Sequence, residues 1–209
     1  MTDQAHVFIV DDDASVRKGL MRLLKSAGYT VETFASANEF LERPAYNGIG
    51  CLILDLRMPG LDGIELQQQL DSSDCNLPVI FLSGHAGVSD SVKAMKCGAS
   101  DFLTKPVDGG VLLSAVNAAL DTHRDQLNKQ SEVSVIQKRF DNLTARELET
   151  ARWLITGMLN KQIADKLGIA EKTVKVHRSN VMQKMEISSV AELVRLCAMA
   201  DINPMTTRE

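Results

Sequence analysis

The chain lacks a long apolar run and a signal for export. Its longest apolar runs, such as Val7–Val10 and Val79–Leu82, are far shorter than the roughly 20 residues that span a bilayer. Met1–His6 is polar and contains no basic segment followed by an apolar one, so a secretory leader is not indicated. We therefore expect a cytoplasmic protein with no membrane partner.

Cysteine is sparse and widely spaced. Cys51, Cys75, Cys97 and Cys197 form no C-x-x-C pair and no Cys/His cluster at zinc-ligand spacing, so neither a disulfide framework nor structural zinc is expected. Cys51 and Cys97 are interpreted as small buried apolar residues. The chain also lacks a P-loop, a dinucleotide-binding glycine motif and a nucleophile elbow.

The charge is unevenly distributed along the 209 residues. Residues 1–120 carry 15 acidic and 9 basic side chains, a net charge of −6, whereas residues 141–209 carry 9 and 10, a net charge of +1. The length allows two domains, and 44% apolar with 24% charged residues is ordinary globular composition. An acidic first part and a near-neutral last part suggest two different tasks.

Residues 6–122 alternate between short β-branched runs and amphipathic stretches. This alternation predicts an α/β domain, a doubly wound, five-stranded parallel sheet of the flavodoxin-like kind with helices on both faces. The expected strands are His6–Val10, Thr30–Phe34, Gly50–Leu54, Pro78–Leu82 and Asp101–Leu103. The expected helices are Ala14–Ala27, Glu39–Arg43, Gly63–Leu70, Ser89–Cys97 and Gly110–Leu120.

The remainder of the chain shows only helical patterns, which predicts an all-α domain of four helices. Thr144 and Glu147 form a capping box at its start, and Gly157 and Gly168 stand where helix C-caps are expected. The four helices are about Ala145–Gly157, Lys161–Leu167, Glu171–Met185 and Ser189–Met199. The join at residues 121–140 has no Pro or Gly, so the last helix of the first domain should continue into a linker helix or be followed by one. The expected divisions are 1–122, a helical linker at 123–140, and 141–209.

Acidic and basic residues follow three of the expected strands. Asp11, Asp12 and Asp13 follow the first strand, Asp55 follows the third, and Lys105 follows the fifth. In an open α/β sheet these strand ends share one crevice, where the repulsion between carboxylates favours a divalent cation such as Mg²⁺. One carboxylate could then act as a nucleophile toward phosphorus. The acidic run alone could be a solvated turn, but its agreement with Asp55 and Lys105 favours a site.

Residues 6–122 resemble a response-regulator receiver domain. The resemblance lies in Val10–Asp13, Leu54–Gly60, Ser83–His85 and Phe102–Pro106. It implies that Asp55 accepts a phosphoryl group from a sensor histidine kinase. It also implies that Asp12, Asp55 and the backbone carbonyl of Arg57 hold Mg²⁺, with Asp11 acting mainly through water.

The same resemblance assigns the residues that respond to phosphorylation. Ser83 matches the hydroxyl that moves to the phosphoryl group, Phe102 the aromatic ring that follows it, and Lys105 the cation beside it. The Lys105–Pro106 bond matches a cis peptide, and His85 is interpreted as a loop histidine near the site.

Two of the tail helices, Lys161–Leu167 and Glu171–Met185, are separated by a short turn that contains Gly168. This spacing indicates a helix-turn-helix unit. In the second helix Val174, His177, Val181 and Met185 recur at helical spacing and should face inward. Its basic residues suit DNA, although a solvated charged face is the commoner fate of such residues. They are Lys172, Lys175, Arg178 and Lys184.

Residues 143–196 resemble a LuxR-type helix-turn-helix domain in three segments, 143–147, 157–164 and 173–180. The resemblance implies that Lys175, Val176 and Ser179 face the major groove. It makes Asn160, Lys161, Thr173 and Arg178 candidate contacts to the DNA backbone, and Lys184 is a further basic candidate. Ala170 stands where the family often has a capping Ser, and compensation nearby is expected.

Together the two parts resemble the FixJ/NarL group of response regulators, especially its FixJ-like members. We therefore expect a transcription regulator, not an enzyme, that dimerises on phosphorylation and binds double-stranded promoter DNA, with RNA polymerase as a partner. An aspartyl-phosphate phosphatase is one alternative, but Arg57 stands where such enzymes carry a second Asp. A signalling adaptor whose tail binds protein is another, and salt-sensitive binding to a duplex separates it from the main hypothesis. Constitutive DNA binding with an inactive receiver is disfavoured because every expected pocket residue is present.

Overall fold

A computed structural model describes residues 5–72, 75–84 and 88–206. The chain divides into two compact units, with the boundary between Leu127 and Asn128, and each unit is described by itself. Among the residues that the structure describes, no helix is long and apolar enough to cross a membrane.

The first unit is built on a five-stranded parallel sheet with the strand order β2-β1-β3-β4-β5. This order confirms the predicted flavodoxin-like fold. The central strands are almost fully buried, whereas the edge strands β2 and β5 are mostly half-buried because each has one neighbour. The strands are β1 (His6–Val10), β2 (Thr30–Phe34), β3 (Gly50–Asp55), β4 (Val79–Ser83) and β5 (Asp101–Thr104).

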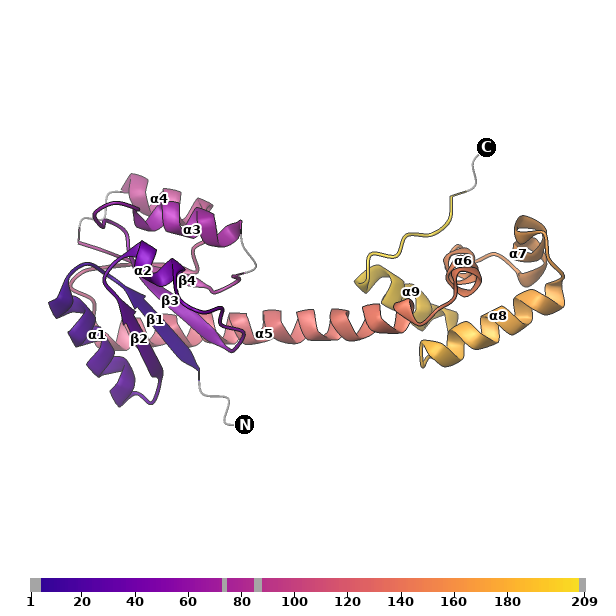
Figure 1. Cartoon of the computed structure of the whole chain (residues 1–209), viewed down its shortest axis with the longest axis horizontal. Coiled ribbons are helices and arrows are strands. Elements are labelled where there is room, and N and C mark those ends of the chain that lie inside the picture. The colour runs from indigo at the N-terminus through magenta and orange to yellow at the C-terminus, as the bar shows by residue number, and fades with distance from the viewer. Residues whose placement is uncertain (1–4, 73–74, 85–87, 207–209) are drawn as a thin grey trace. The chain divides into compact units, whose positions relative to one another are not determined.

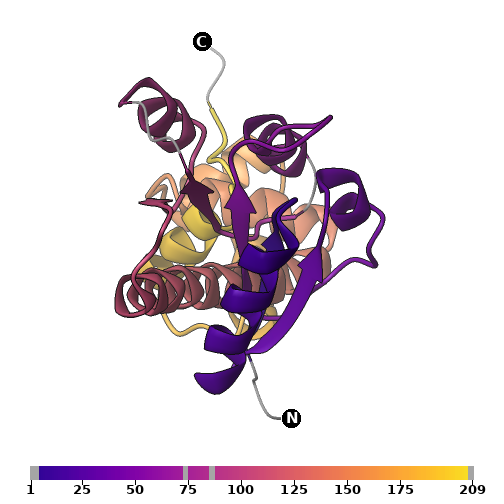
Figure 2. The same ribbon diagram turned by 90° about the vertical axis from the view of Figure 1, so that its left-hand side faces the viewer.

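Helices cover both faces of this sheet (Figure 1; Figure 2 shows the same unit turned by 90°). One face packs against α1 (Ala14–Ser26) and the N-terminal part of α5 (Gly109–Asp141). The other face packs against α2 (Ala37–Leu41), α3 (Gly63–Asp71) and α4 (Val88–Lys96). The burial of alternate strand residues on the two faces produces two separate apolar cores.

Helix α5 runs without a break for 33 residues. Its first turns bury Leu112 and Val116 in the first unit, and its last turns bury Ile136 and Phe140 in the core of the second. Within the first unit His123 is 4% exposed, and its Nδ1 accepts a hydrogen bond of 3.1 Å from the Gly50 N–H. Burial lowers the pKa of His123, so the neutral ring ties α5 to the start of β3.

The second unit contains the four predicted helices around a core that includes Trp153, the single tryptophan of the chain. They are α6 (Ala145–Leu154), α7 (Asn160–Leu167), α8 (Glu171–Lys184) and α9 (Val190–Met199). Thr144 and Glu147 form the predicted capping box of α6. Gly168 ends α7 in the left-handed region, at φ 64°, where a side chain would be strained.

Several local expectations were wrong. Helix α6 ends at Leu154, and the following turn is closed by Gly157 at φ 83°, so the helix is three residues shorter than expected. Helix α2 spans Ala37–Leu41 because Ser36 caps it, two residues earlier than the apolar pattern suggested. Cys97 is half-buried at the end of α4, whereas Cys51 is fully buried as expected.

Candidate functional site

Three carboxylates meet at the carboxyl ends of β1 and β3. Asp11 and Asp12 directly follow β1, and Asp55 is the last residue of β3. These strands are neighbours in register, with Val10 opposite Leu54. Oxygen atoms of Asp11, Asp12 and Asp55 therefore lie within 4.8 Å of one another. The oxygen-only set of donors suits a hard divalent cation such as Mg²⁺.

The ammonium group of Lys105 joins two of these carboxylates. Lys105 follows β5, and its Nζ lies 2.7 Å from Asp11 Oδ2 and 2.9 Å from Asp55 Oδ2. The Lys105–Pro106 peptide is cis, as expected. Burial alone would disfavour the charge on Lys105, but the hydrogen bonds that its ammonium donates to Asp11 and Asp55 outweigh burial and raise the pKa of Lys105.

Burial has the opposite consequence for Asp55. Desolvation raises the pKa of the Asp55 carboxyl, although hydrogen bonding and the charge of Lys105 act in the other direction. The side chain of Asp55 is 10% exposed and that of Asp11 is 1% exposed. The carboxylates of the pocket therefore carry negative charge where little water can solvate it, and this raises the free energy of the charged form. A bound cation or electrophile would relieve that cost.

The other acidic-run residue has a local role. Asp13 caps α1, because its Oδ1 accepts hydrogen bonds from the N–H groups of Ser15 at 2.7 Å and Val16 at 3.3 Å. These bonds lower the pKa of Asp13. Its own N–H donates to Asp11 Oδ1 at 2.9 Å, which helps to orient Asp11. The Arg57 N–H donates a hydrogen bond of 3.4 Å to Asp55 Oδ1.

Ser83 and Phe102 lie on the strands next to the pocket. Ser83 ends β4, is 1% exposed, and pairs in register with Thr104. Its carbonyl accepts a hydrogen bond of 2.8 Å from the Lys105 N–H. Phe102 is half-buried on β5 and packs against the core shared with α2, α3 and α4. His85 lies outside the described residues.

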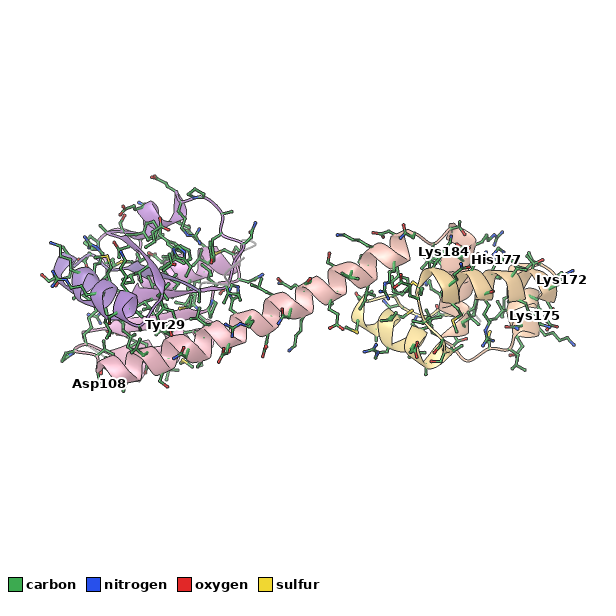
Figure 3. All side chains as sticks on the ribbon, turned by 90° about the horizontal axis from the view of Figure 1, so that it is seen from below. Tyr29, Asp108, Lys172, Lys175, His177 and Lys184 are labelled. Carbon is green, nitrogen blue, oxygen red and sulfur yellow. The ribbon has the colours of Figure 1, made fainter. Side chains whose placement is uncertain are left out.

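Helices α7 and α8 form the expected helix-turn-helix pair. Val174, Val181 and Met185 are fully buried, which confirms the predicted inner face, whereas His177 is half-buried. Figure 3 shows Lys172 and Lys175 near the N-terminal end of α8 and Lys184 near its other end. The residues of the predicted reading face, Lys175, Val176 and Ser179, are exposed.

The predicted contacts to the DNA backbone flank this face. Lys161 on α7 and Thr173 on α8 are exposed. Arg178 is half-buried, and its Nη1 lies 3.5 Å from Oδ1 of Asn160. This contact joins the start of α7 to the middle of α8, so both side chains are held near the reading face.

Lys184 is placed differently from the other predicted DNA contacts. Its Nζ lies 2.6 Å from Oε2 of Glu147, whose side chain is 5% exposed, and 3.2 Å from the carbonyl oxygen of Asn142. The hydrogen bond from Lys184, with that from the Thr144 N–H, lowers the pKa of Glu147 to about 2. The charge of Lys184 is therefore paired with Glu147, and this pair holds α8 against the start of α6.

Two family comparisons agree with these two sites. The family described as "Response regulator receiver domain" matches residues 7–117. The family described as "Bacterial regulatory proteins, luxR family" matches residues 141–197. The chain belongs to the response regulators with a LuxR-type DNA-binding domain. It is thus a DNA-binding regulator of a two-component system, in a family of transcription regulators rather than enzymes.

Individual relatives resemble this response regulator over nearly its whole length. The response regulator protein TodT of Pseudomonas putida is 44% identical over 94% of this chain and 87% of its own. The transcriptional regulatory protein FixJ of Bradyrhizobium diazoefficiens is 38% identical over 96% of this chain and 98% of its own. The solved structure of the response regulator StyR is 46% identical, with a TM-score of 0.82 over 93% of this chain and 98% of that one.

Two of the ion pairs that sequence reasoning missed bear on the functional sites of the response regulator. Arg57 Nη2 lies 3.1 Å from Asp90 Oδ2 and links the segment after Asp55 to α4. Lys184 and Glu147 form the second pair. Neither pair follows a fixed helical spacing, so no local pattern indicates them. The Glu147 pair had only one signal, an acidic capping-box residue that the packing of α8 would cover.

Helix α8 starts without a side-chain cap. Ala170 has extended backbone angles typical of an N-cap, φ −71° and ψ 144°, but no side-chain oxygen. The expected compensation is not found among the described cap contacts, because only the Ala170 carbonyl accepts, from the N–H groups of Thr173 and Val174. The first turn of the recognition helix therefore has N–H groups that a capping residue could satisfy.

Replacing Ala170 by Ser is expected to stabilise the second unit by about 1 kcal/mol, the usual value of an N-cap. The reason is a new hydrogen bond from the first turn of α8 to the Ser oxygen. Urea unfolding followed by Trp153 fluorescence measures the free energy of unfolding of the second unit, because the only tryptophan lies in this unit. Ala170→Val, which has no oxygen, is the control, and equal midpoints for the Ser and Val variants would contradict the prediction.

Proposed function

We propose that a sensor histidine kinase phosphorylates this response regulator on Asp55, and that phosphorylation promotes dimerisation and promoter binding. One observation carries the proposal. The Asp55 carboxylate lies within 4.8 Å of those of Asp11 and Asp12 and 2.9 Å from the ammonium of Lys105. This is a nucleophile surrounded by groups that bind a cation and neutralise a phosphoryl group.

The transfer needs no further acid or base from the chain. An Asp55 oxygen attacks the phosphorus of a phosphohistidine, the new P–O bond forms, and the P–N bond breaks with its electron pair left on the imidazole, which takes up a proton from solvent. Lys105 offsets negative charge on the transferring oxygens. Asp12, Asp55 and the Arg57 carbonyl would hold Mg²⁺, with Asp11 acting through water, and the ion would supply further charge neutralisation.

Phosphorylation of Asp55 would change the structure of the receiver through residues on β4 and β5. Ser83 ends β4 beside the pocket, and its carbonyl is bonded to the Lys105 N–H. A phosphoryl group on Asp55 offers the Ser83 hydroxyl a new acceptor. Movement of Ser83 would free space for Phe102, which is half-buried one strand away. The β5 and α4 surface would then change and favour a homodimer.

The response regulator would then bind double-stranded promoter DNA and recruit RNA polymerase. Lys175, Val176 and Ser179 are exposed on α8 and would enter the major groove. Asn160, Lys161, Thr173 and Arg178 would contact the backbone. Lys184 would contribute mainly by holding α8 in place, because its charge is already paired with Glu147.

The test compares binding to a genomic fragment that the full chain itself selects. Wild type, Asp55→Asn and the exposed-residue control Asp71→Asn are each treated with acetyl phosphate and Mg²⁺. Wild type and Asp71→Asn should bind more tightly after treatment, and Asp55→Asn should not. Phosphate-dependent binding that survives in Asp55→Asn would overturn the proposal, as would tight binding that ignores phosphate in all three proteins.

Lys175→Ala is expected to weaken DNA binding about tenfold, within the range of a base-edge or phosphate contact. The slope of log affinity against log salt should fall by about 1 if Lys175 neutralises a phosphate. Its ion pair with Glu171, at 3.1 Å, is exposed on both sides and adds little stability. Arg195→Ala, exposed on α9, is the control, and an equal loss of affinity in both variants would contradict the assignment.

A further inference from the structure

A second cavity lies at the opposite end of the receiver sheet from Asp55. Its volume is about 320 Å³, within the size range of small-molecule sites, about 300–1,000 Å³. The segments that line it precede β3 and β4, so it lies at the amino ends of these strands. Leu41, Ala45 and Leu70 give it apolar walls, and Arg43, Tyr46, Asn47 and Cys75 provide polar groups.

Arg43 lies against two aromatic rings in the wall of this cavity. Its guanidinium carbon lies 4.0 Å from the ring centroid of Phe40 and 4.9 Å from that of Phe8. Such stacking orients a guanidinium without using its N–H groups. The Nε of Arg43 is buried and has no hydrogen-bond partner among the described residues. Arg43 therefore brings a positive charge to the cavity wall, and this charge favours an anionic group in the cavity.

The thiol of Cys75 lies beside this cation. Arg43 Nη2 is 3.5 Å from Cys75 Sγ, and Cys75 is half-buried in the wall of the cavity. Two other cysteines are poor nucleophiles, since burial raises the pKa of Cys51 to about 12 and that of Cys197 to about 11. A thiol with access, room and a neighbouring cation is the arrangement of a modifiable cysteine.

We infer that Cys75 is a site of mixed-disulfide formation with a small disulfide that carries carboxylates. The Cys75 sulfur, having released its proton to solvent, attacks one sulfur of the disulfide. The new S–S bond forms and the old one breaks, with its electron pair on the leaving sulfur, which takes up a proton. Cys75 is oxidised and the small disulfide is reduced to one thiol. Arg43 attracts the carboxylates, and the cavity accommodates the attached half.

The test measures rates of modification in the full chain. Oxidised glutathione, which is anionic, and cystamine, which is cationic, are added separately, and peptide mapping by mass spectrometry follows each cysteine. Cys75 should prefer oxidised glutathione over cystamine by about fivefold relative to the half-buried Cys97, as a unit charge pair at about 4 Å implies even in water. The receiver part is net acidic, so general electrostatics would produce the opposite preference.

Two variants test whether the charge of Arg43 causes the anion preference at Cys75. Arg43→Gln should lose the anion preference at Cys75, and Arg43→Lys, which keeps the charge, should retain most of it. The buried Cys51 reports on folding, because it reacts only if the receiver opens. No anion preference at Cys75 in the wild type would overturn the inference, whether or not Arg43→Gln folds. Persistence of the preference in a folded Arg43→Gln protein would also overturn it.

Discussion

Asp55→Asn is expected to abolish incorporation of a phosphoryl group from acetyl phosphate and, at the same time, to stabilise the receiver unit. The first effect follows because an amide is a poor nucleophile. The second follows because burial raises the pKa of Asp55, which means that the folded state disfavours the charged form. Asn resembles the uncharged carboxyl, so it removes this penalty. A gain of about 1 kcal/mol is typical for a stabilising change at an active site.

The stability difference between wild type and Asp55→Asn should depend on pH in a definite direction. A carboxyl whose folded pKa is raised binds its proton more readily in the folded state than in the unfolded one. Wild type therefore recovers stability as the pH falls through the folded pKa of Asp55 toward the unfolded value. The advantage of Asp55→Asn should be largest near neutral pH and shrink in acid.

The measurements are intact mass after treatment with acetyl phosphate, and urea unfolding followed by circular dichroism in the presence of a chelator. Trp153 fluorescence separately reports the second unit, which should not change. Added Mg²⁺ should stabilise wild type more than the variant, because the variant offers one carboxylate fewer. An Asn variant that gains phosphate at the wild-type rate, or that unfolds more easily at neutral pH, would contradict the prediction.

The acidic pocket could be predicted from sequence because it depends on topology. In a parallel sheet, the carboxyl ends of the strands lie on one edge, so residues that directly follow strands must come close. Asp11, Asp55 and Lys105 obey this rule, although 94 residues separate Asp11 from Lys105. Strand positions were clear from short β-branched runs, and errors of one residue at strand ends did not disturb the grouping.

Features that depend on side-chain packing could not be predicted in the same way. The Arg57–Asp90 pair requires α4 to lie beside the segment after Asp55, and nothing in the periodicity of α4 specifies that distance. The continuity of α5 was left open because residues 121–140 mix polar and apolar residues; packing at each end, including Ile136 and Phe140, holds it helical. The start of α2 was available from Ser36, whose Oγ accepts a hydrogen bond from the Glu39 N–H, but the apolar pattern hid this N-cap.

Lys184 shows the same limit most clearly. Its basic side chain on a recognition helix suggested DNA, but its orientation is set by Glu147 on α6, 37 residues away. A charge on the outer surface and a charge that compensates a buried carboxylate look alike in sequence. The two roles make different predictions for stability, which allows an experiment to separate them.

Lys184→Met is expected to destabilise the second unit by about 3 kcal/mol, the low end for a broken buried ion pair because Lys184 itself is partly exposed, since it leaves the buried Glu147 carboxylate without its cation. The Lys184–Glu147 ion pair also makes the stability of the wild-type second unit depend on pH. The pKa of Glu147 is lowered to about 2 from its ordinary value of 4.5, so the stabilisation that Glu147 provides is complete above about pH 4.5 and is lost as the pH falls toward 2. Lys184→Met should lose much of this dependence.

Urea unfolding by Trp153 fluorescence provides the measurement, and the double variant Glu147→Gln/Lys184→Met provides the control. Removing both charges should recover part of the lost stability, since the penalty comes from the unpaired carboxylate rather than from the missing ammonium. DNA affinity at low temperature, where the unit stays folded, should fall less for Lys184→Met than for Lys175→Ala. A variant that keeps wild-type stability but loses DNA affinity would instead make Lys184 a direct DNA contact, whose charge the duplex draws away from Glu147.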